Sequence, residues 1–233
     1  SNIIIGSGHT DNGSNSTLVG GSNNTVCSNT SAGIILGGGS NCLSGSSSII
    51  IGGIYNQLLS SASLIGGGSY NYIKPTDGGL ASAYSTIVGG LCNKIFSPGR
   101  GTDNEVIYGQ FIGGGIQNRI HTTLGNGGEY NSILGGRANS ISGSNLGCAF
   151  IGGGNANSIS GSSALSAILG GQSNCILDHE KTFIIGSNLT SDKACYTFMN
   201  NLDVEGTVSA SIFSGSFVGD GSGLTNIPTS SIV

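Results

Sequence analysis

The side chains best suited to chemistry fall in three stretches that interrupt an otherwise repetitive chain of 233 residues. These stretches are KPTDGGLASAY at 74–84, FSPGRGTDNEVIYGQ at 96–110 and HTTLGNGGEYN at 121–131. They concentrate charged and aromatic groups: Asp77, Tyr84, Arg100, Asp103, Glu105, Tyr108, His121, Glu129 and Tyr130. Loops on a rigid scaffold often carry recognition, so this set predicts a lateral patch that binds a glycan or a protein. The alternative is that the loops are solvated and bind nothing, or that they shield an apolar flank of the fold.

Catalysis is the stricter hypothesis for the same residues. Cleavage of a glycosidic bond needs two carboxyl groups roughly 5 to 9.5 Å apart, which Asp103 with Glu105, or Glu129 from a neighbouring coil, could supply. The chain holds only 11 acidic residues and three histidines, and it has no G-x-S-x-G motif of a serine hydrolase. The segment 178–180 (Asp-His-Glu) is expected to form a polar cap. We therefore expect no enzyme, with a glycan-degrading protein as the alternative.

The composition excludes several classes of protein. Glycine accounts for 44 residues and charged residues for 8%, against about 25% in typical proteins, yet 36% of the chain is apolar and periodically placed. The net charge of −4 and the scattered seven Lys and Arg argue against nucleic-acid binding. No apolar run reaches the roughly 18 residues of a membrane span, so we expect no membrane insertion.

The six cysteines lack metal-ligand spacing. None forms a CxxC pair, and Cys175 with His179 has no partner pair, so neither a metal nor a cofactor is expected. We expect free thiols that act as small core residues, which favours assembly in a reducing cytoplasm.

One phrase, Ile-x-Gly-Gly-x-x-Asn-x-Ile, organises most of the chain, as in NSILGGRANSISG at 131–143. We number each copy from its first Ile or Leu as position 0, which puts the two glycines at +2 and +3 and the asparagine at +6. The starts are Leu18, Ile35, Ile50, Ile65, Ile87, Ile112, Ile133, Ile151 and Ile168. The asparagines, for which a structural role is expected, are Asn24, Asn41, Asn56, Asn71, Asn93, Asn118, Asn139, Asn157 and Asn174.

The spacing of these copies predicts an all-β fold, a repetitive parallel β-roll or β-solenoid. Most starts are 15 to 18 residues apart, too short for a helix pair but sufficient for one coil. The Gly-Gly pair supplies positive φ for a turn. The asparagine tolerates left-handed backbone and can bond to its own main chain or to its copy in the next coil. Insertions in a stack leave from corresponding positions, so the three long stretches should cluster on one side.

The residues beside position 0 predict a second buried face. In some copies position −1 is large and +1 is glycine, as at Phe111 and Gly113; in the next copy +1 is large, as at Leu134. A strand that is apolar on both faces must be buried on both. The simplest cover is another chain, and a long loop of the same chain is the alternative.

The repeat resembles the head repeats of trimeric autotransporter adhesins, and similar repeats occur in fibre proteins of phages and large viruses. The likeness covers about residues 1–190 and implies a trimer, three-fold or intertwined, in which each chain forms a β-roll around a common axis. Residues 191–233 are expected to form a glycine-punctuated β connector that leads to a missing C-terminal module. Within it, GDGSGLTNIP at 219–228 resembles the stretch before the intramolecular chaperone of phage tail fibres.

Together the two likenesses imply a structural fibre segment of a virion, which spaces or displays elements that bind a host receptor. Implied partners are two further copies of the chain, other fibre or baseplate proteins, and a glycan or protein of the host surface. The expected location is the extracellular particle, after assembly in the host cytoplasm. A glycan-degrading tailspike and a bacterial surface adhesin are the alternatives.

Overall fold

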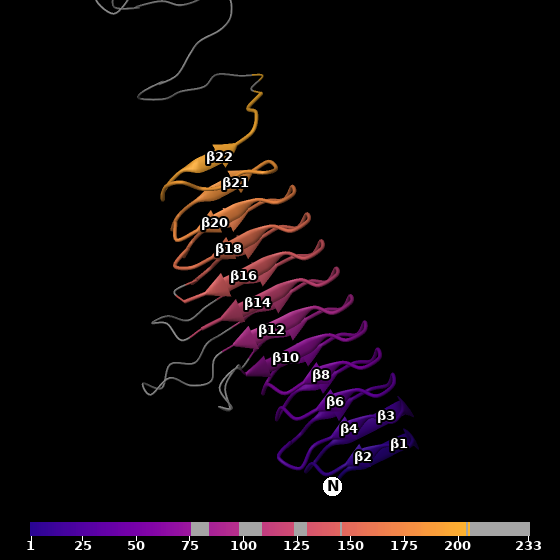
Figure 1. Cartoon of the computed structure of the whole chain (residues 1–233). Coiled ribbons are helices and arrows are strands. Elements are labelled where there is room, and N and C mark those ends of the chain that lie inside the picture. The colour runs from indigo at the N-terminus through magenta and orange to yellow at the C-terminus, as the bar shows by residue number, and fades with distance from the viewer. Residues whose placement is uncertain (76–83, 98–108, 124–129, 145, 204, 206–233) are drawn as a thin grey trace, which may run out of the picture. The chain divides into compact units, whose positions relative to one another are not determined.

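The computed structural model of the chain is a parallel β-solenoid, which confirms the predicted fold class (Figure 1). It describes residues 1–75, 84–97, 109–123, 130–144, 146–203 and 205. These residues form strands and turns without a helix, and accordingly none of them belongs to a helix able to cross a membrane. Each coil up to β20 contributes one short strand to each of two sheets, β21 and β22 extend only the first sheet, and successive coils pair in parallel.

The strands are short because each coil turns after two to six residues. The twelve-stranded sheet consists of β1 (Ile3–Ser7), β3 (Thr17–Ser22), β5 (Ile34–Ile35), β7 (Ile49–Ile50), β9 (Leu64–Ile65), β11 (Thr86–Ile87), β13 (Phe111–Ile112), β15 (Ser132–Ile133), β17 (Phe150–Ile151), β19 (Ala167–Ile168), β21 (Phe183–Ile185) and β22 (Thr197–Met199). The ten-stranded sheet consists of β2 (Thr10–Asp11), β4 (Thr25–Val26), β6 (Cys42–Leu43), β8 (Gln57–Leu58), β10 (Tyr72–Pro75), β12 (Lys94–Ser97), β14 (Arg119–Thr122), β16 (Ser140–Gly143), β18 (Ser158–Ser160) and β20 (Cys175–Leu177).

The core is a double column of aliphatic side chains between the two sheets. Position 0 faces inward from the twelve-stranded sheet and position +8 from the ten-stranded sheet, and every member of both columns is fully buried. The columns remain in register across the longest insertion, where Ile87 pairs with Ile112 and Ile95 with Ile120. The insertions therefore lengthen individual coils without interrupting the stack.

The second glycine of each Gly-Gly pair allows the coils to approach closely. It has φ between 74° and 91° in all nine copies. A Cβ on Gly136 would clash with the carbonyl oxygen of Gly154 in the next coil, whereas a Cβ on Gly135 would meet no atom within 4 Å. The prediction that the glycine pair supplies the turn's positive φ is therefore right for the second glycine in every copy. For the first glycine it holds in four copies, at Gly20, Gly37, Gly114 and Gly153, and not at Gly135.

The residue before the asparagine, at position +5, has the left-handed backbone that was expected of the asparagine itself. Tyr55, Cys92, Gln117 and Ala138 all have φ between 54° and 58°, and the asparagines do not. This conformation turns the N–H at +5 toward the preceding coil, so that Gln117 N donates to Leu91 O. The asparagine can then turn its side chain into the stack.

The asparagines form a buried ladder that links each coil to the next. Asn118 Nδ2 donates to Gly114 O of its own coil at 2.8 Å and to Gly136 O of the next at 3.0 Å. Its Oδ1 accepts the Asn139 backbone N–H at 3.0 Å. Both predicted partners, the own main chain and the next copy, are thus confirmed. The ladder starts where Asn24 N donates to Nδ1 of His9 and ends where Leu189 N donates to Oδ1 of Asn174.

The cysteines are free, as predicted, but the prediction that they fill the core is wrong. Four are half-buried and two, Cys148 and Cys195, are exposed, because they occupy outward positions and turns instead of positions 0 and +8. Burial, together with the neighbouring Cys27 thiol 3.9 Å away, raises the pKa of Cys42 to about 11. Cys42 therefore stays protonated at neutral pH, and thiolate chemistry is disfavoured there.

The solenoid extends past the predicted boundary at residue 190. Strand β22 pairs with β21 through Phe183–Thr197 and Ile184–Phe198, and the compact unit ends at Asn201. Most of the remaining connector, including 219–228, lies outside the described residues.

The glycine pair offers a matched test of the close approach between coils. Gly136→Ala should destabilise the fold strongly, because the left-handed backbone costs alanine about 1–2 kcal/mol and the clash with Gly154 must also be relieved. Gly135→Ala should be tolerated. Thermal unfolding followed by circular dichroism compares the two, and equal melting temperatures would contradict the assigned roles.

The ladder predicts a second pair of outcomes. Asn118→Ala leaves the buried Asn139 N–H without its acceptor, which should lower the free energy of unfolding by about 2 kcal/mol per chain. The control is Gln117→Ala, because Gln117 is exposed and alanine already occupies the equivalent left-handed position at Ala138 and Ala156. Denaturant unfolding measures both variants; no loss with Asn118→Ala would mean that the ladder does not stabilise the stack.

Candidate functional site

The outward side chains of the ten-stranded sheet change character along the stack. Positions +7 and +9 flank the buried +8 residue and so face away from the core. In the coils of β16 and β18 these positions hold serine, and in the coil of β20 they hold Cys175 and Leu177. From β8 to β14 they hold large polar, aromatic and cationic groups, apart from Leu59 at +9 of the β8 coil. The +7 column there reads Gln57, Tyr72, Lys94 and Arg119, and the +9 column adds Lys74, Phe96 and His121.

These side chains contact one another across adjacent strands. The Tyr72 and Phe96 rings meet edge to face at 5.6 Å between centroids, and the Arg119 guanidinium lies 5.3 Å from the centre of the Phe96 ring. Arg119 Nη2 donates a hydrogen bond to Nδ1 of His121 at 3.1 Å. The guanidinium is therefore held over an aromatic face by two partners, which limits the freedom it would lose on binding a ligand.

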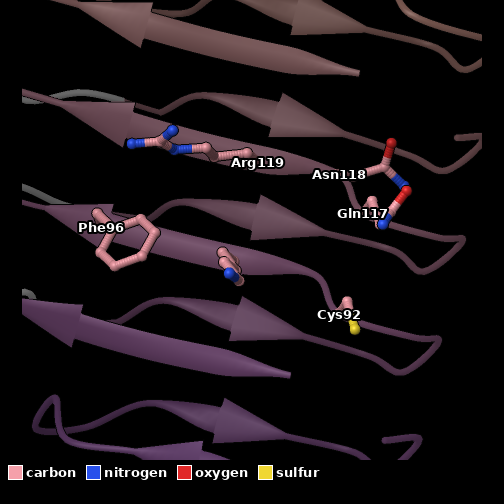
Figure 2. Close-up of a pocket in the computed structure, with 6 residues that line it drawn as sticks. Cys92, Phe96, Gln117, Asn118 and Arg119 are labelled. Atoms are coloured by element: carbon pink, nitrogen blue, oxygen red, sulfur yellow. The ribbon is translucent and has the colours of Figure 1, made fainter. Parts of the chain in front are cut away.

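Two neighbouring hollows lie on the outer surface of these coils. One hollow of about 420 Å³ is lined by Cys92, Lys94, Phe96, Gln117, Asn118 and Arg119. Figure 2 shows Phe96 and Arg119 on neighbouring strands, with Cys92 and Gln117 at the turns that precede them. A second hollow of about 340 Å³ is lined by Tyr55, Gln57, Tyr70, Asn71, Tyr72, Cys92 and Lys94. The two hollows are adjacent, because Cys92 and Lys94 line both, and we call them together the β8–β14 groove.

One end of the β8–β14 groove is aromatic. Tyr55 and Tyr70 are about half exposed and stack with 5.1 Å between centroids and 20° between planes. Both occupy position +5, where the left-handed backbone presents the side chain outward. Together with Tyr72 they form an apolar wall that still carries hydroxyl groups.

The groove is also locally cationic. Lys94 and Arg119 are exposed and pair in register on β12 and β14. Within the described residues neither forms an ion pair with a carboxylate; the one ion pair found there joins Lys181 to Glu180. Two of the seven Lys and Arg are therefore neighbours here, although the chain as a whole carries a charge of −4.

The predicted loop patch falls only partly within the described residues. Asp77, Arg100, Asp103, Glu105, Tyr108 and Glu129 lie outside them. His121 lies on β14 beside the groove, as described above. Tyr84 and Tyr130 are more than half exposed, and the Tyr130 ring packs against Gly109 of the preceding coil. A binding role for the nine residues stays a prediction.

The three insertions begin on neighbouring strands. They follow β10, β12 and β14, which pair with one another in this order. Their described ends therefore leave the same edge of the ten-stranded sheet, next to the outward columns that line the β8–β14 groove.

Catalytic groups are not brought together in the described part of the chain. Asp103, Glu105 and Glu129, the candidate acids, lie outside it. Near the polar segment 178–180, His179 Nδ1 lies 2.8 Å from Ser191 Oγ, but Ser191 is 5% exposed and also accepts the Leu177 N–H, as a structural hydroxyl would. No cluster of His, Cys, Asp or Glu that could hold a metal occurs among the described residues.

Four residues of the groove were not among the predicted site residues, because they lie in repeats whose pattern predicts core and not in the polar insertions: Tyr72, Lys94, Phe96 and Arg119. The signal was present at positions +7 and +9 of four consecutive copies, where serine gives way to aromatic and basic residues. No protein-family profile matches the chain, and no curated protein matches it.

Proposed function

We propose that the chain is a structural fibre segment of a virion, assembled as a homotrimer, which spaces or displays elements that bind the host. The observation that supports it best is an apolar column on the outer face of the twelve-stranded sheet. Its members at +1 are half exposed in the single chain, at 49–52%: Leu36, Ile51, Val88, Leu134 and Leu169.

The regular alternation along this column favours a contact surface for another chain over apolar side chains that are exposed at random. In two of the three coils with glycine at +1, an aromatic ring at −1 lies beside it: a Cβ on Gly113 would lie 3.3 Å from Cε1 of Phe111, and one on Gly152 3.4 Å from Cε1 of Phe150. The third such coil has Leu64 at −1 and Gly66 at +1. Each of these coils therefore presents one large side chain on this face. Continuous apolar surface of this kind is typical of interfaces between subunits.

The two outer faces of the solenoid differ, which favours one orientation in the assembly. The outer face of the twelve-stranded sheet is apolar, whereas that of the ten-stranded sheet carries serines, cysteines and the β8–β14 groove. Cyclic symmetry would bury the apolar face of every copy near a shared axis. The ten-stranded sheet and the ends of the three insertions would then face outward, where a host surface is accessible.

The virion location rests on the resemblance of the repeats and of 219–228 to phage and viral fibres. Fibre or baseplate proteins are the partners we propose at its ends, and a host glycan or protein at its side. A structural spacer needs no catalytic residues. The hydrogen bonds of the ladder join each coil to the next, which suits a segment that must stay rigid along its length. We therefore propose no enzymatic activity.

A charge placed on the apolar column tests the assembly. The native protein should sediment with three times the 23.1 kDa mass of one chain. Leu134→Asp should yield monomers, because three carboxylates would enter a dry interface at a cost of several kcal/mol each. A monomer would tolerate the change, since Leu134 is 52% exposed in the single chain.

The matched control is Ser158→Asp, which adds the same charge on the outer face of the ten-stranded sheet. It should leave the mass at that of the native protein. Sedimentation equilibrium measures all three proteins, and circular dichroism checks that each is folded. A folded, monomeric native protein would overturn the proposed assembly.

A further inference from the structure

We propose that the β8–β14 groove binds an acidic polysaccharide, laid along the stack of coils. The proposal rests on the proposed function in one respect: it names the class of host-surface component that the fibre segment would recognise. The site consists of Tyr55, Tyr70, Tyr72, Lys94, Phe96 and Arg119, and all six line the groove.

The geometry suits a polymer with a short repeat. Neighbouring strands lie about 4.8 Å apart, which is close to the length of one pyranose ring. Gln57, Tyr72, Lys94 and Arg119 occupy the same register position in four consecutive coils, so the groove offers one outward group per step. An extended sugar chain that runs along the solenoid would meet a new side chain with each ring.

The chemistry of the lining matches both faces of a sugar acid. The rings of Tyr72 and Phe96 offer flat apolar surface to the C–H face of a pyranose, and the amides of Gln57 and Gln117 can bond its hydroxyls. Lys94 and Arg119 can bind a carboxylate or a sulfate. Since neither pairs with a carboxylate within the described residues, an anionic ligand would have no such partner to displace there.

The charge density favours a glycan over a nucleic acid. A nucleic acid carries a phosphate at every nucleotide and requires a matching row of cations. The +7 column supplies two cations in four coils, and the chain carries a net charge of −4. The two exposed tyrosines stack on each other at 5.1 Å, which leaves no gap between them for a base. A sugar acid, with charge on only some of its rings, fits this arrangement better.

Titration calorimetry on the full chain tests the proposal with three probes. The first is a hyaluronate oligomer, which carries a carboxylate on every second ring. The second is the same oligomer with its carboxyl groups reduced to alcohols, which keeps the rings and removes the charge. The third is a single-stranded oligodeoxythymidylate. We expect binding of the first, binding at least roughly tenfold weaker of the second, and the weakest binding of the third.

The variants separate the contribution of charge from that of stacking. Lys94→Ser with Arg119→Ser should weaken binding of the acidic oligomer at least roughly tenfold and leave the reduced oligomer unaffected. Phe96→Ser should weaken both oligomers. Serine is the native residue at the equivalent positions Ser140 and Ser142, so these changes should preserve the fold. The control is Lys193→Ser, which removes one cation beside Tyr196, in another coil, and should not alter binding.

The outcomes distinguish this proposal from the proposed assembly. Preferential binding of the acidic oligomer that is lost with Lys94 and Arg119 supports the groove. The proposal is overturned by absence of binding to every probe, by tighter binding of the oligodeoxythymidylate, or by equal losses with Lys193→Ser. Sedimentation of the same samples measures the assembly separately. A trimer that does not bind the acidic oligomer overturns only the proposed ligand, and a monomer that binds it overturns only the proposed trimeric fibre.

Discussion

The fold depends on the buried amide of the asparagine at position +6. Its Nδ2 donates to one carbonyl in its own coil and one in the next, and its Oδ1 accepts the next asparagine's N–H. A buried amide that loses such partners costs more than the bonds contribute when made, so any change in the stacking of coils is penalised at every step. This penalty, together with the close approach at the second glycine, holds the coils in one register.

Strict register has a consequence for the surface of the solenoid. Because position 0 stacks on position 0 through all the coils, each outward position also forms a straight column. A column can change its chemistry without disturbing the core, since its side chains alternate with the buried ones. One sheet therefore carries apolar groups from Leu36 to Leu169, while the other changes from serine to the aromatic and basic groups of the β8–β14 groove. A slip by one residue would exchange inner and outer faces and destroy both surfaces at once.

The repeat made the core and the ladder predictable, because nine copies show the same types at the same spacing. Features whose residue types vary between copies were less accessible. The left-handed residue at +5 is Tyr55 in one coil, Cys92 in another and Ala138 in a third. Because no residue type is shared at this position, the shared backbone conformation cannot be recognised from the sequence. Lys94 and Arg119 are neighbours on adjacent strands although 25 residues separate them in sequence. Their proximity can be predicted from the sequence only if the insertion between them is treated as a loop, so that the two repeats become neighbouring coils.

The geometry of the coil explains why the insertions and the groove occur on the same side of the solenoid. A stack held at every turn by the ladder tolerates added chain only where the ladder is absent, which is the return from the ten-stranded sheet to the twelve-stranded one. The described ends of all three insertions lie on this return, after β10, β12 and β14. The same strands carry the large outward groups, so chain length and side-chain chemistry vary together on the side away from the apolar column. If assembly and recognition use these opposite outer faces, as we propose, each can change without the other, because the interior of the coil stays the same.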